Sequence, residues 1–445
     1  MKIISLTLLI FVVSFSSLAQ NYDGFIFHRP GKRKYKINFI DYNNLIIVKV
    51  KLNGIPMNFL LDTGVDKTVV FGLDDINNQI KNNSKKILIK GVSNAKTYAY
   101  KMKNNELEIG KLKDTNHTVY AIFDKSFNVS DKIGYQVQGI IGYEFFKTLI
   151  VKINYIKNHL KVYNPQFFSK SLNNYETLDL KLFKQKPYIR TSLQQYDIWR
   201  EFTFLIDTGS GDAIWVHPKS DVKIPPLSFD DILGYGFADM IKGKRSKAQA
   251  FKLGSNLLKQ PKIAYPDSLA YTGVSFAKNI GVLGSEILRR FHWIFDYNNL
   301  KIYFKPNHDI DKPFNYDMSG LILKYDGYQQ IVQYQHVFSR AQVQHDNSTG
   351  YNKAQTVKSK LIIKKRPILK VGAVRLNSSA FEAGFIAGDQ ILKIEGRASY
   401  RYDLEEIFEI LSSTEGREIS FVIKRGGRTY TKSLTLRSRL KEVDD

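Results

Sequence analysis

Short apolar runs separated by turn residues recur along the chain. Residues 46–52 form one run, the turn signal Asn-Gly-Ile-Pro follows at 53–56, and residues 57–61 return as a second run. Runs of this length, rich in β-branched and aromatic residues, predict strands paired as hairpins. The same order recurs at 188–193 and 202–206, so the pattern predicts a mainly β fold.

The chain also repeats whole segments. Each copy contains an apolar run ending in Asp-Thr-Gly, then a Gly-apolar-apolar-Gly segment, then a tyrosine-containing strand pattern, in the same order and with similar spacing. Such duplication indicates one supersecondary unit used twice. Short helices are expected after Gly142 and Gly284. The matching segments are 59–64 with 204–209, 139–146 with 281–288, and 154–163 with 296–303.

A single Asp-Thr-Gly triplet is most simply a turn after a strand, but two copies in one context call for another explanation. Over residues 35–307 the duplicated pattern resembles the aspartic proteases of the pepsin and retropepsin type. The resemblance implies a bilobal β-fold with pseudo-twofold symmetry and one Asp-Thr-Gly loop from each lobe at the interface. It also implies hydrolysis of a polypeptide bound in an extended conformation, by a single chain, with no metal or other cofactor.

The resemblance makes Asp62 and Asp207 the candidate catalytic pair. Two carboxylates held close together cannot both ionise easily, so they share a proton. One can then act as general base on a water molecule while the other donates a proton to the scissile carbonyl oxygen. The resemblance also implies supporting roles in the active-site loops for Thr63, Gly64, Thr208, Gly209 and Ser210.

One position departs from the family pattern, which usually has Ser, Thr or Ala after the glycine. Ser210 fits, whereas the first copy has Val65. A serine there can hydrogen-bond the outer oxygen of its aspartate and favour the charged form, and a valine cannot. We therefore expect Asp207 to be the ionised member of the pair and Asp62 the protonated one.

The family closes a hairpin flap over an extended peptide and hydrogen-bonds it through the flap backbone. Two glycine-containing stretches, 91–100 and 234–244, are the candidate flaps. Tyr98 and Tyr100 in the first stretch either face the cleft or pack on the hairpin. The residue pattern does not decide between these two roles.

The C-terminal part has a different character. The segment AGFIAGDQIL at 383–392, followed by Ile-Glu-Gly, resembles the central signature of PDZ domains, and 404–411 predicts an amphipathic helix. The resemblance implies a small α/β PDZ-like domain that binds a peptide partner or the substrate by adding a strand to a sheet edge. Its backbone N–H groups would hold the terminal carboxylate of the peptide. The candidate carboxylate-binding loop is Gly320, Leu321, Ile322 and Leu323.

About forty residues rich in Gln, Asn, Ser and Lys separate that loop from the next PDZ-like strand at 371–374. This insertion, around 325–366, is expected to be either a long exposed loop or disordered.

The N-terminus reads as a secretory signal. Lys2 precedes an apolar run over residues 3–13, and Ser-Leu-Ala at 17–19 supplies a small-residue cleavage site. The run is shorter than the roughly 20 residues that span a bilayer, and no later segment could do so. The chain has no cysteine, so export without disulfides favours a bacterial periplasm or the extracellular space. The expected segments are a signal peptide at 1–19, protease lobes at 20–165 and 166–312, and the PDZ-like domain at 313–440.

Composition fits this reading. Of the 445 residues, 43% are hydrophobic and 24% charged, as in a folded water-soluble protein. The formal net charge is +24, but no nucleic-acid-binding motif accompanies it, so we expect solvated basic surfaces and no nucleic-acid partner. No metal-binding or serine-hydrolase motif is present. The remaining alternative to an enzyme is a catalytically silent scaffold that binds peptides with the same domains.

Overall fold

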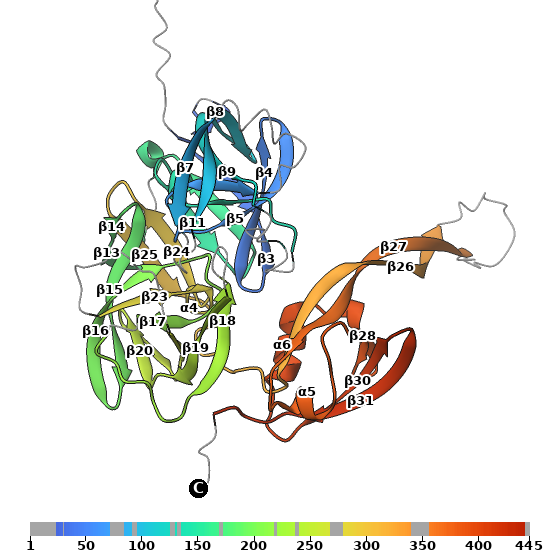
Figure 1. Cartoon of the computed structure of the whole chain (residues 1–445). Helices are drawn as coiled ribbons and strands as arrows, with labels where there is room; N and C mark the ends of the chain where they lie inside the picture. The colour runs from blue at the N-terminus through green and yellow to red at the C-terminus, as the bar shows by residue number, and fades with distance from the viewer. Residues whose placement is uncertain are drawn as a thin grey trace, which may run out of the picture.

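The computed structural model describes residues 24–29, 31–71, 84–90, 96–124, 130, 135–168, 172–217, 220–235, 240–267, 279–339 and 356–440. The predicted signal peptide and the tip of the first candidate flap (91–95) lie outside these residues. The described chain is mainly β, as predicted. Figure 1 shows two β lobes, blue and green, with an orange and red C-terminal domain beside them.

The two lobes contain sheets built on one plan. In each sheet a short strand lies between the strand that ends in Asp-Thr-Gly, with which it is parallel, and a further strand, with which it is antiparallel. The N-lobe sheet has the order β1(Ile26–Phe27), β9(Leu112–Ile122), β6(Thr68–Phe71), β10(Gly139–Ile141), β5(Ile55–Leu61), β4(Leu45–Leu52), β8(Lys96–Ile109) and β7(Lys85–Lys90), with β3(Ile40–Tyr42) paired to β4.

The C-lobe sheet repeats the central part of this order, with β17-β23-β16-β15 in place of β6-β10-β5-β4. Matching order and direction confirm the duplication predicted from the sequence. The strands are β18(Phe229–Tyr235), β19(Met240–Lys247), β22(Lys262–Pro266), β17(Ile214–Val216), β23(Ile280–Leu283), β16(Ile198–Ile206), β15(Lys186–Gln195), β20(Ala250–Leu253) and β21(Asn256–Lys259), with β14(Lys181–Phe183) paired to β15.

A third sheet joins the lobes. Its central pair is β11 from the N-lobe and β24 from the C-lobe, antiparallel with Ile153 opposite Trp293. Phe146, Trp293 and Phe295 are buried in one hydrophobic cluster that extends into both lobes. Because burying large aromatic side chains dominates core stability, the lobes are held as one body. The sheet order is β13(Glu176–Asp179), β25(Lys301–Pro306), β24(Phe291–Asp296), β11(Ile150–Asn154), β12(His159–Tyr163) and β2(Lys34–Asn38).

Helices in the lobes are short. The predicted helices after Gly142 and Gly284 are present as α3(Tyr143–Phe146) and α4(Ser285–Leu288), and a 3-10 turn spans Pro165–Phe167. Within the described part of the chain, no helix is both long and apolar enough to cross a membrane.

The C-terminal domain has its own sheet and core. The helix α6(Leu404–Leu411) starts at a capping box formed by Asp403 and Glu406 and buries Ile407 and Leu411 against the sheet. The sheet order is β26(Leu321–Ser339), β27(Thr356–Val374), β28(Gln390–Ile394), β30(Glu418–Arg425) and β31(Arg428–Thr435), with β29(Arg397–Ala398) on β28 and α5(Ser379–Glu382) and a 3-10 turn (Ser399–Arg401) outside it.

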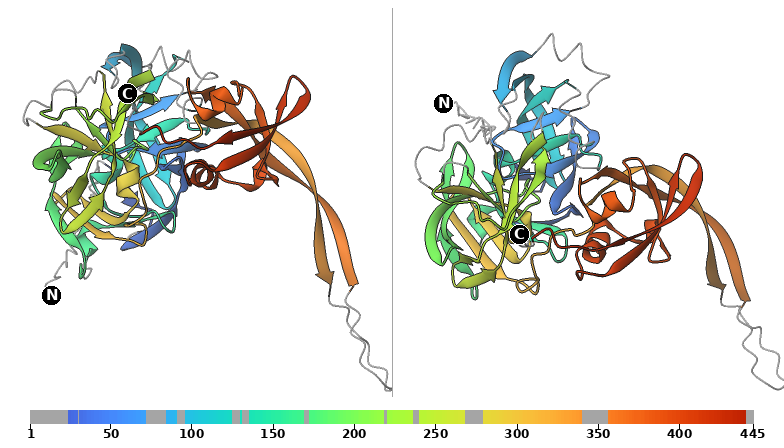
Figure 2. Two further views of the ribbon diagram at one scale, coloured as in Figure 1. Left: turned by 90° about the horizontal axis from the view of Figure 1, so that it is seen from below. Right: turned by 60° about the horizontal axis from the view of Figure 1, so that its bottom comes forward.

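The insertion in this domain differs from the prediction of a loop or disorder. β26 and β27 continue as one antiparallel pair from Leu321 opposite Val374 to Ser339 opposite Thr356. The resulting hairpin projects far beyond the rest of the sheet (Figures 1 and 2). The aromatic and β-branched residues Tyr328, Ile331 and Val332 favour a strand here, but the high Gln and Lys content concealed this preference.

Candidate active site

The Asp-Thr-Gly loops are held at the ends of equivalent strands. β5 ends immediately before Asp62, whose N–H donates to the carbonyl oxygen of Ile141 at 2.8 Å. β16 ends immediately before Asp207, whose N–H donates to Leu283 O at 2.9 Å. In both lobes the glycine-bounded strand therefore fixes the point where the chain leaves the sheet, which places both aspartates at the interface between the lobes.

Thr63 and Thr208 lock the two loops together across that interface. The Thr63 hydroxyl donates to Ile206 O at 2.6 Å and accepts from the Thr208 N–H at 3.0 Å. The Thr208 hydroxyl donates to Leu61 O at 2.7 Å and accepts from the Thr63 N–H at 3.1 Å. Both threonines are fully buried. Because these four reciprocal hydrogen bonds are shielded from water, they fix the relative position of the loops.

The two carboxyl groups meet in a crosswise arrangement. Gly64 N–H donates to Asp62 Oδ1 at 2.7 Å, and Gly209 N–H donates to Asp207 Oδ1 at 2.9 Å. Each carboxyl group then lies against the glycine of the opposite loop. A β-carbon on Gly64 would lie 2.9 Å from the Asp207 carboxyl group, and one on Gly209 would lie closer still to that of Asp62. Glycine is needed at both positions because any larger residue would push the carboxyl groups apart.

Burial raises the pKa of both aspartates, and their proximity couples them. The charge of Asp207 and a hydrogen bond between the two side chains raise the pKa of Asp62 further. Asp207 accepts that hydrogen bond and one from the Gly209 N–H, and both lower its pKa against the effect of burial. The pKa of Asp62 is therefore raised more than that of Asp207, and we assign the shared proton to Asp62.

This direction agrees with the sequence-based expectation, but its cause differs. The Ser210 N–H donates to the backbone carbonyl of Asp207 at 3.3 Å, as the Val65 N–H does to that of Asp62. The described residues show no hydrogen bond from the Ser210 hydroxyl to that carboxylate.

Lys186 belongs to the candidate site, although the sequence did not reveal it. It lies at the start of β15, and its positive charge lowers the pKa of both Asp62 and Asp207 against the effect of burial. No motif marks this lysine among the 66 lysine and arginine residues of the chain. Only the register of β15 in the folded sheet brings it to the pair.

A cavity of about 1310 Å³ opens above the pair. Its walls include matched apolar residues from the two lobes, together with charged side chains such as Lys186, Asp212 and Arg245. Gly234 and Ile241, from the second candidate flap, line the same cavity. In the first candidate flap, Tyr100 packs on Phe123 with ring centroids 5.4 Å apart. The matched residues are Leu60 with Leu205 and Ile140 with Val282.

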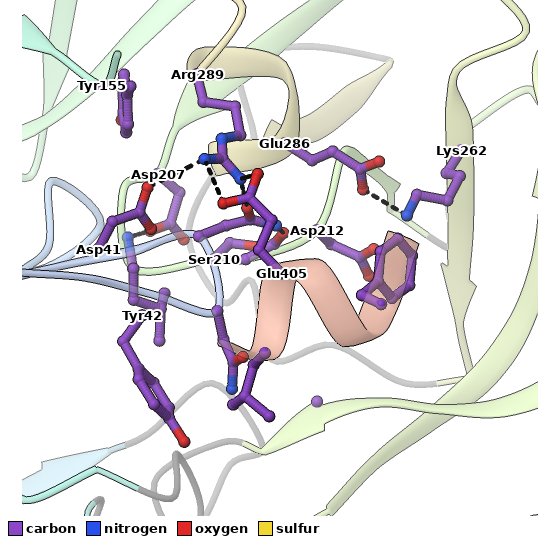
Figure 3. A pocket seen from close by; sticks show the side chains of 18 of the residues that line it. Asp41, Tyr42, Tyr155, Asp207, Ser210, Asp212, Lys262, Glu286, Arg289 and Glu405 are labelled. Carbon is purple, nitrogen blue, oxygen red and sulfur yellow. Dashed lines mark hydrogen bonds and ion pairs between the residues drawn. The ribbon is translucent and has the colours of Figure 1, made fainter. Parts of the chain in front are cut away.

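Further charged side chains line the cavity. Arg289 donates to Asp41 at 3.1 Å and pairs with Glu405 of α6 at 3.2 Å (Figure 3). Figure 3 also shows Lys262 beside Glu286, an ion pair of 2.7 Å. Among the residues that the structure describes, no cluster of three or more histidine and acidic side chains could hold a metal ion.

The proposed carboxylate-binding loop of the C-terminal domain lies at the start of β26, at the sheet edge, as a PDZ groove requires. The N–H groups of Gly320 and Leu321 in this loop, however, already have partners within the chain. Asp317 accepts from Ser319 N–H at 3.1 Å and from Gly320 N–H at 3.0 Å. The Leu321 N–H donates to the Ser319 hydroxyl at 3.0 Å.

Comparison with known families supports both parts of this description. Residues 48–145 match the family described as aspartyl protease, and residues 370–425 match the family described as PDZ domain. The suspected combination of a protease domain with a C-terminal PDZ domain is therefore confirmed. The first match includes Asp62, whereas the second lobe is identified by its repeated topology. No curated protein matches the chain.

Proposed function

We propose that this protein is an exported aspartic-type endopeptidase that hydrolyses peptide bonds with water activated between Asp62 and Asp207. The observation that supports this most strongly is the crosswise packing of the two carboxyl groups against the glycines of the opposite loops. A binding scaffold has no need of two buried acids held close enough to share a proton. General acid–base hydrolysis requires that arrangement.

The proposed reaction uses the proton distribution described above. The ionised Asp207 takes a proton from water as the water oxygen attacks the scissile carbonyl carbon. Asp62 gives its proton to the carbonyl oxygen, and a neutral tetrahedral diol forms. The C–N bond then breaks as the nitrogen takes the proton from Asp207, while a diol hydroxyl returns a proton to Asp62. The products are an amine and a carboxylic acid, and the pair regains its starting state.

The cavity supports an extended polypeptide as substrate. Apolar residues from both lobes line it on either side of the pair, and the β18–β19 hairpin reaches it through Leu233, Gly234 and Ile241. A hairpin in this position can hydrogen-bond a strand-like substrate through its backbone. Both loops come from one chain, so a single copy is sufficient for activity. The N-terminal signal pattern supports export to the periplasm or the extracellular space.

The test is incubation of the purified mature protein with a mixed peptide library, with and without a statine-type inhibitor that mimics the tetrahedral diol. We expect internal cleavage that the inhibitor blocks. A silent scaffold would instead bind peptides and leave every one of them intact. Mass spectrometry of the library distinguishes these results directly.

A further inference from the structure

The candidate carboxylate-binding loop of the C-terminal domain is already bonded to a carboxylate, that of Asp317, three residues before Gly320. In addition to the two backbone N–H bonds, this side chain accepts the Ser319 hydroxyl at 2.6 Å and pairs with Arg375 at 3.0 Å. These are the interactions that a peptide C-terminus would need from the loop. A free terminal carboxylate would have to displace a partly buried, four-coordinated side chain of the same charge.

Arg375 also fixes this arrangement against the protease part. Its guanidinium group pairs with Asp231 of β18 at 2.8 Å, and Asp231 in turn pairs with Arg245 at 2.8 Å. Asp231 is only 4% exposed at its side chain. Ion pairs that are shielded from water are screened little by dissolved salt. Arg375 and Asp231 therefore link the loop to the C-lobe.

The helix that borders the peptide groove faces the catalytic cavity. Leu404, Phe408 and Ser412, spaced four residues apart, lie on one face of α6 or at its end, and all three line the cavity that contains Asp62 and Asp207. Phe408 is 40% exposed. A half-exposed aromatic side chain in a cleft is a typical anchor for a peptide side chain.

Contacts with both lobes hold α6 in that position. Arg289 of the C-lobe bridges Asp41 of the N-lobe and Glu405 at the start of α6 (Figure 3). On the N-lobe side, the rings of Tyr42 and Tyr325 lie 6.3 Å apart. The wall that α6 contributes is thus part of the folded cleft.

The strand on the other side of the groove has a free edge. In the described sheets β26 pairs only with β27, so its second edge remains available for an added strand. Tyr325 on β26 lines the catalytic cavity together with α6. An extended peptide in the catalytic cleft can therefore continue along the β26 edge without leaving the cavity.

We propose that the C-terminal domain binds an internal segment of the same polypeptide that occupies the catalytic cleft, and does not select a free C-terminus. This inference rests on the proposed peptidase function for the identity of the ligand. It assigns Phe408 as a side chain that contacts the substrate away from the scissile bond. It assigns Asp317 as the group that excludes chain ends.

The experiment measures binding rather than cleavage, with the full mature chain carrying Asp62→Asn. Two fluorescent peptides of identical sequence, taken from a substrate or from the library, end in a free carboxylate or in an amide. We expect equal Kd values within about twofold. Phe408→Ala should weaken both peptides equally, by about tenfold for one lost aromatic anchor. Phe381→Ala, which removes an exposed phenylalanine of α5 that does not line the cavity, is the matched control and should have little effect.

Asp317→Ala supplies a gain-of-function test. Freeing the two N–H groups and Arg375 should make the carboxylate peptide bind about tenfold more tightly than the amide, as expected for charge-assisted hydrogen bonds. Asp317→Asn, which keeps an acceptor in the loop, should not create this preference. Circular dichroism establishes that each variant is folded.

Two results would overturn the inference. One is a tenfold preference of the Asp62→Asn chain for the free carboxylate, and the other is unchanged binding in Phe408→Ala. Neither of these two measurements uses Asp317→Ala, so both remain decisive if that variant does not fold. Failure of the wild-type chain to cleave any peptide would refute the peptidase proposal and leave these binding results to be judged separately.

Discussion

The two Asp-Thr-Gly loops have the same sequence but different surroundings. Their threonines make the same bonds in both directions across the interface, with lengths of 2.6–3.1 Å. Their carboxyl groups differ in pKa, which burial raises in both and which the hydrogen bond between them raises further in Asp62 but lowers in Asp207. The difference teaches that the symmetric residues set the geometry of the pair, while its proton is shared unequally.

Strand register shows a second asymmetry. Tyr188 pairs with Leu205 in the C-lobe as Ile47 pairs with Leu60 in the N-lobe, each two residues before its aspartate. Lys186 therefore occupies the position equivalent to that of Leu45, and both residues line the cavity. One lobe thus supplies a positive charge to the pair, where the other supplies an apolar side chain.

The largest effect is expected from breaking the close approach of the loops. Gly209→Ala would place a β-carbon against the Asp62 carboxyl group, and Gly64→Ala would place one 2.9 Å from that of Asp207. The carboxyl groups would have to move apart to relieve these contacts, which should lower kcat about a hundredfold or more. The greater loss is expected in Gly209→Ala because its clash is closer. Steady-state kinetics on one peptide checks this ranking. Equal activity of both variants and the wild type would contradict the crosswise packing.

The symmetric threonines should contribute equally to stability. Thr63→Val and Thr208→Val each remove a hydroxyl and leave a buried N–H and a buried carbonyl without partners. Each should lower the free energy of unfolding by about 1–3 kcal/mol. Urea denaturation measures this, and the serine variants, which retain the hydroxyl, are the controls. A large effect of only one of the two valine variants would show that the interface is not symmetric.

Removing the charge of Lys186 should move the pH dependence of activity. That charge lowers the pKa of both aspartates, so Lys186→Met should raise both. Activity requires one ionised and one protonated acid, so both limbs of the pH–rate profile should move to higher pH, by roughly half a unit to one unit. Lys181→Met, an exposed lysine at the start of β14, is the control. A shift to lower pH would contradict the assigned role.

The smallest effect is expected at the position after the glycine. Val65→Ser should stabilise the charged form of Asp62 and make the two loops more alike, so the pKa of Asp62 should fall and the alkaline limb of the pH–rate profile should move to lower pH. The shift should be a few tenths of a unit, the scale of one weak hydrogen bond to an acid that is mainly protonated. An unchanged profile would show that the residue after the glycine has no part in the asymmetry.

Much of the protease part could be predicted from the sequence because its signals are local and occur twice. The apolar runs, the Asp-Thr-Gly triplets and the short helices after Gly142 and Gly284 all follow from residues adjacent in the chain. Lys186 and the bridge from Arg289 to Asp41 and Glu405 could not be predicted in this way. They depend on register and on contacts between residues more than a hundred positions apart.

The C-terminal domain was harder to predict from its sequence. Its central signature identifies the fold, and the helix was predicted with its observed bounds of 404–411. Composition misled at the β26–β27 hairpin, where glutamine and lysine occupy strand positions. The role of Asp317 was missed because an aspartate three residues before a glycine reads as an ordinary turn residue until its hydrogen bonds are seen.

The central claim is that the two aspartates act as one unit on a single water molecule. The most direct test compares kcat for Asp62→Asn, Asp207→Asn and the double variant on one peptide substrate. We expect each single variant to lose at least about a hundredfold in kcat. The double variant should be as active as the less active single variant, because either change disables the whole pair. A single variant with near wild-type activity, or losses that multiply in the double variant, would contradict the account.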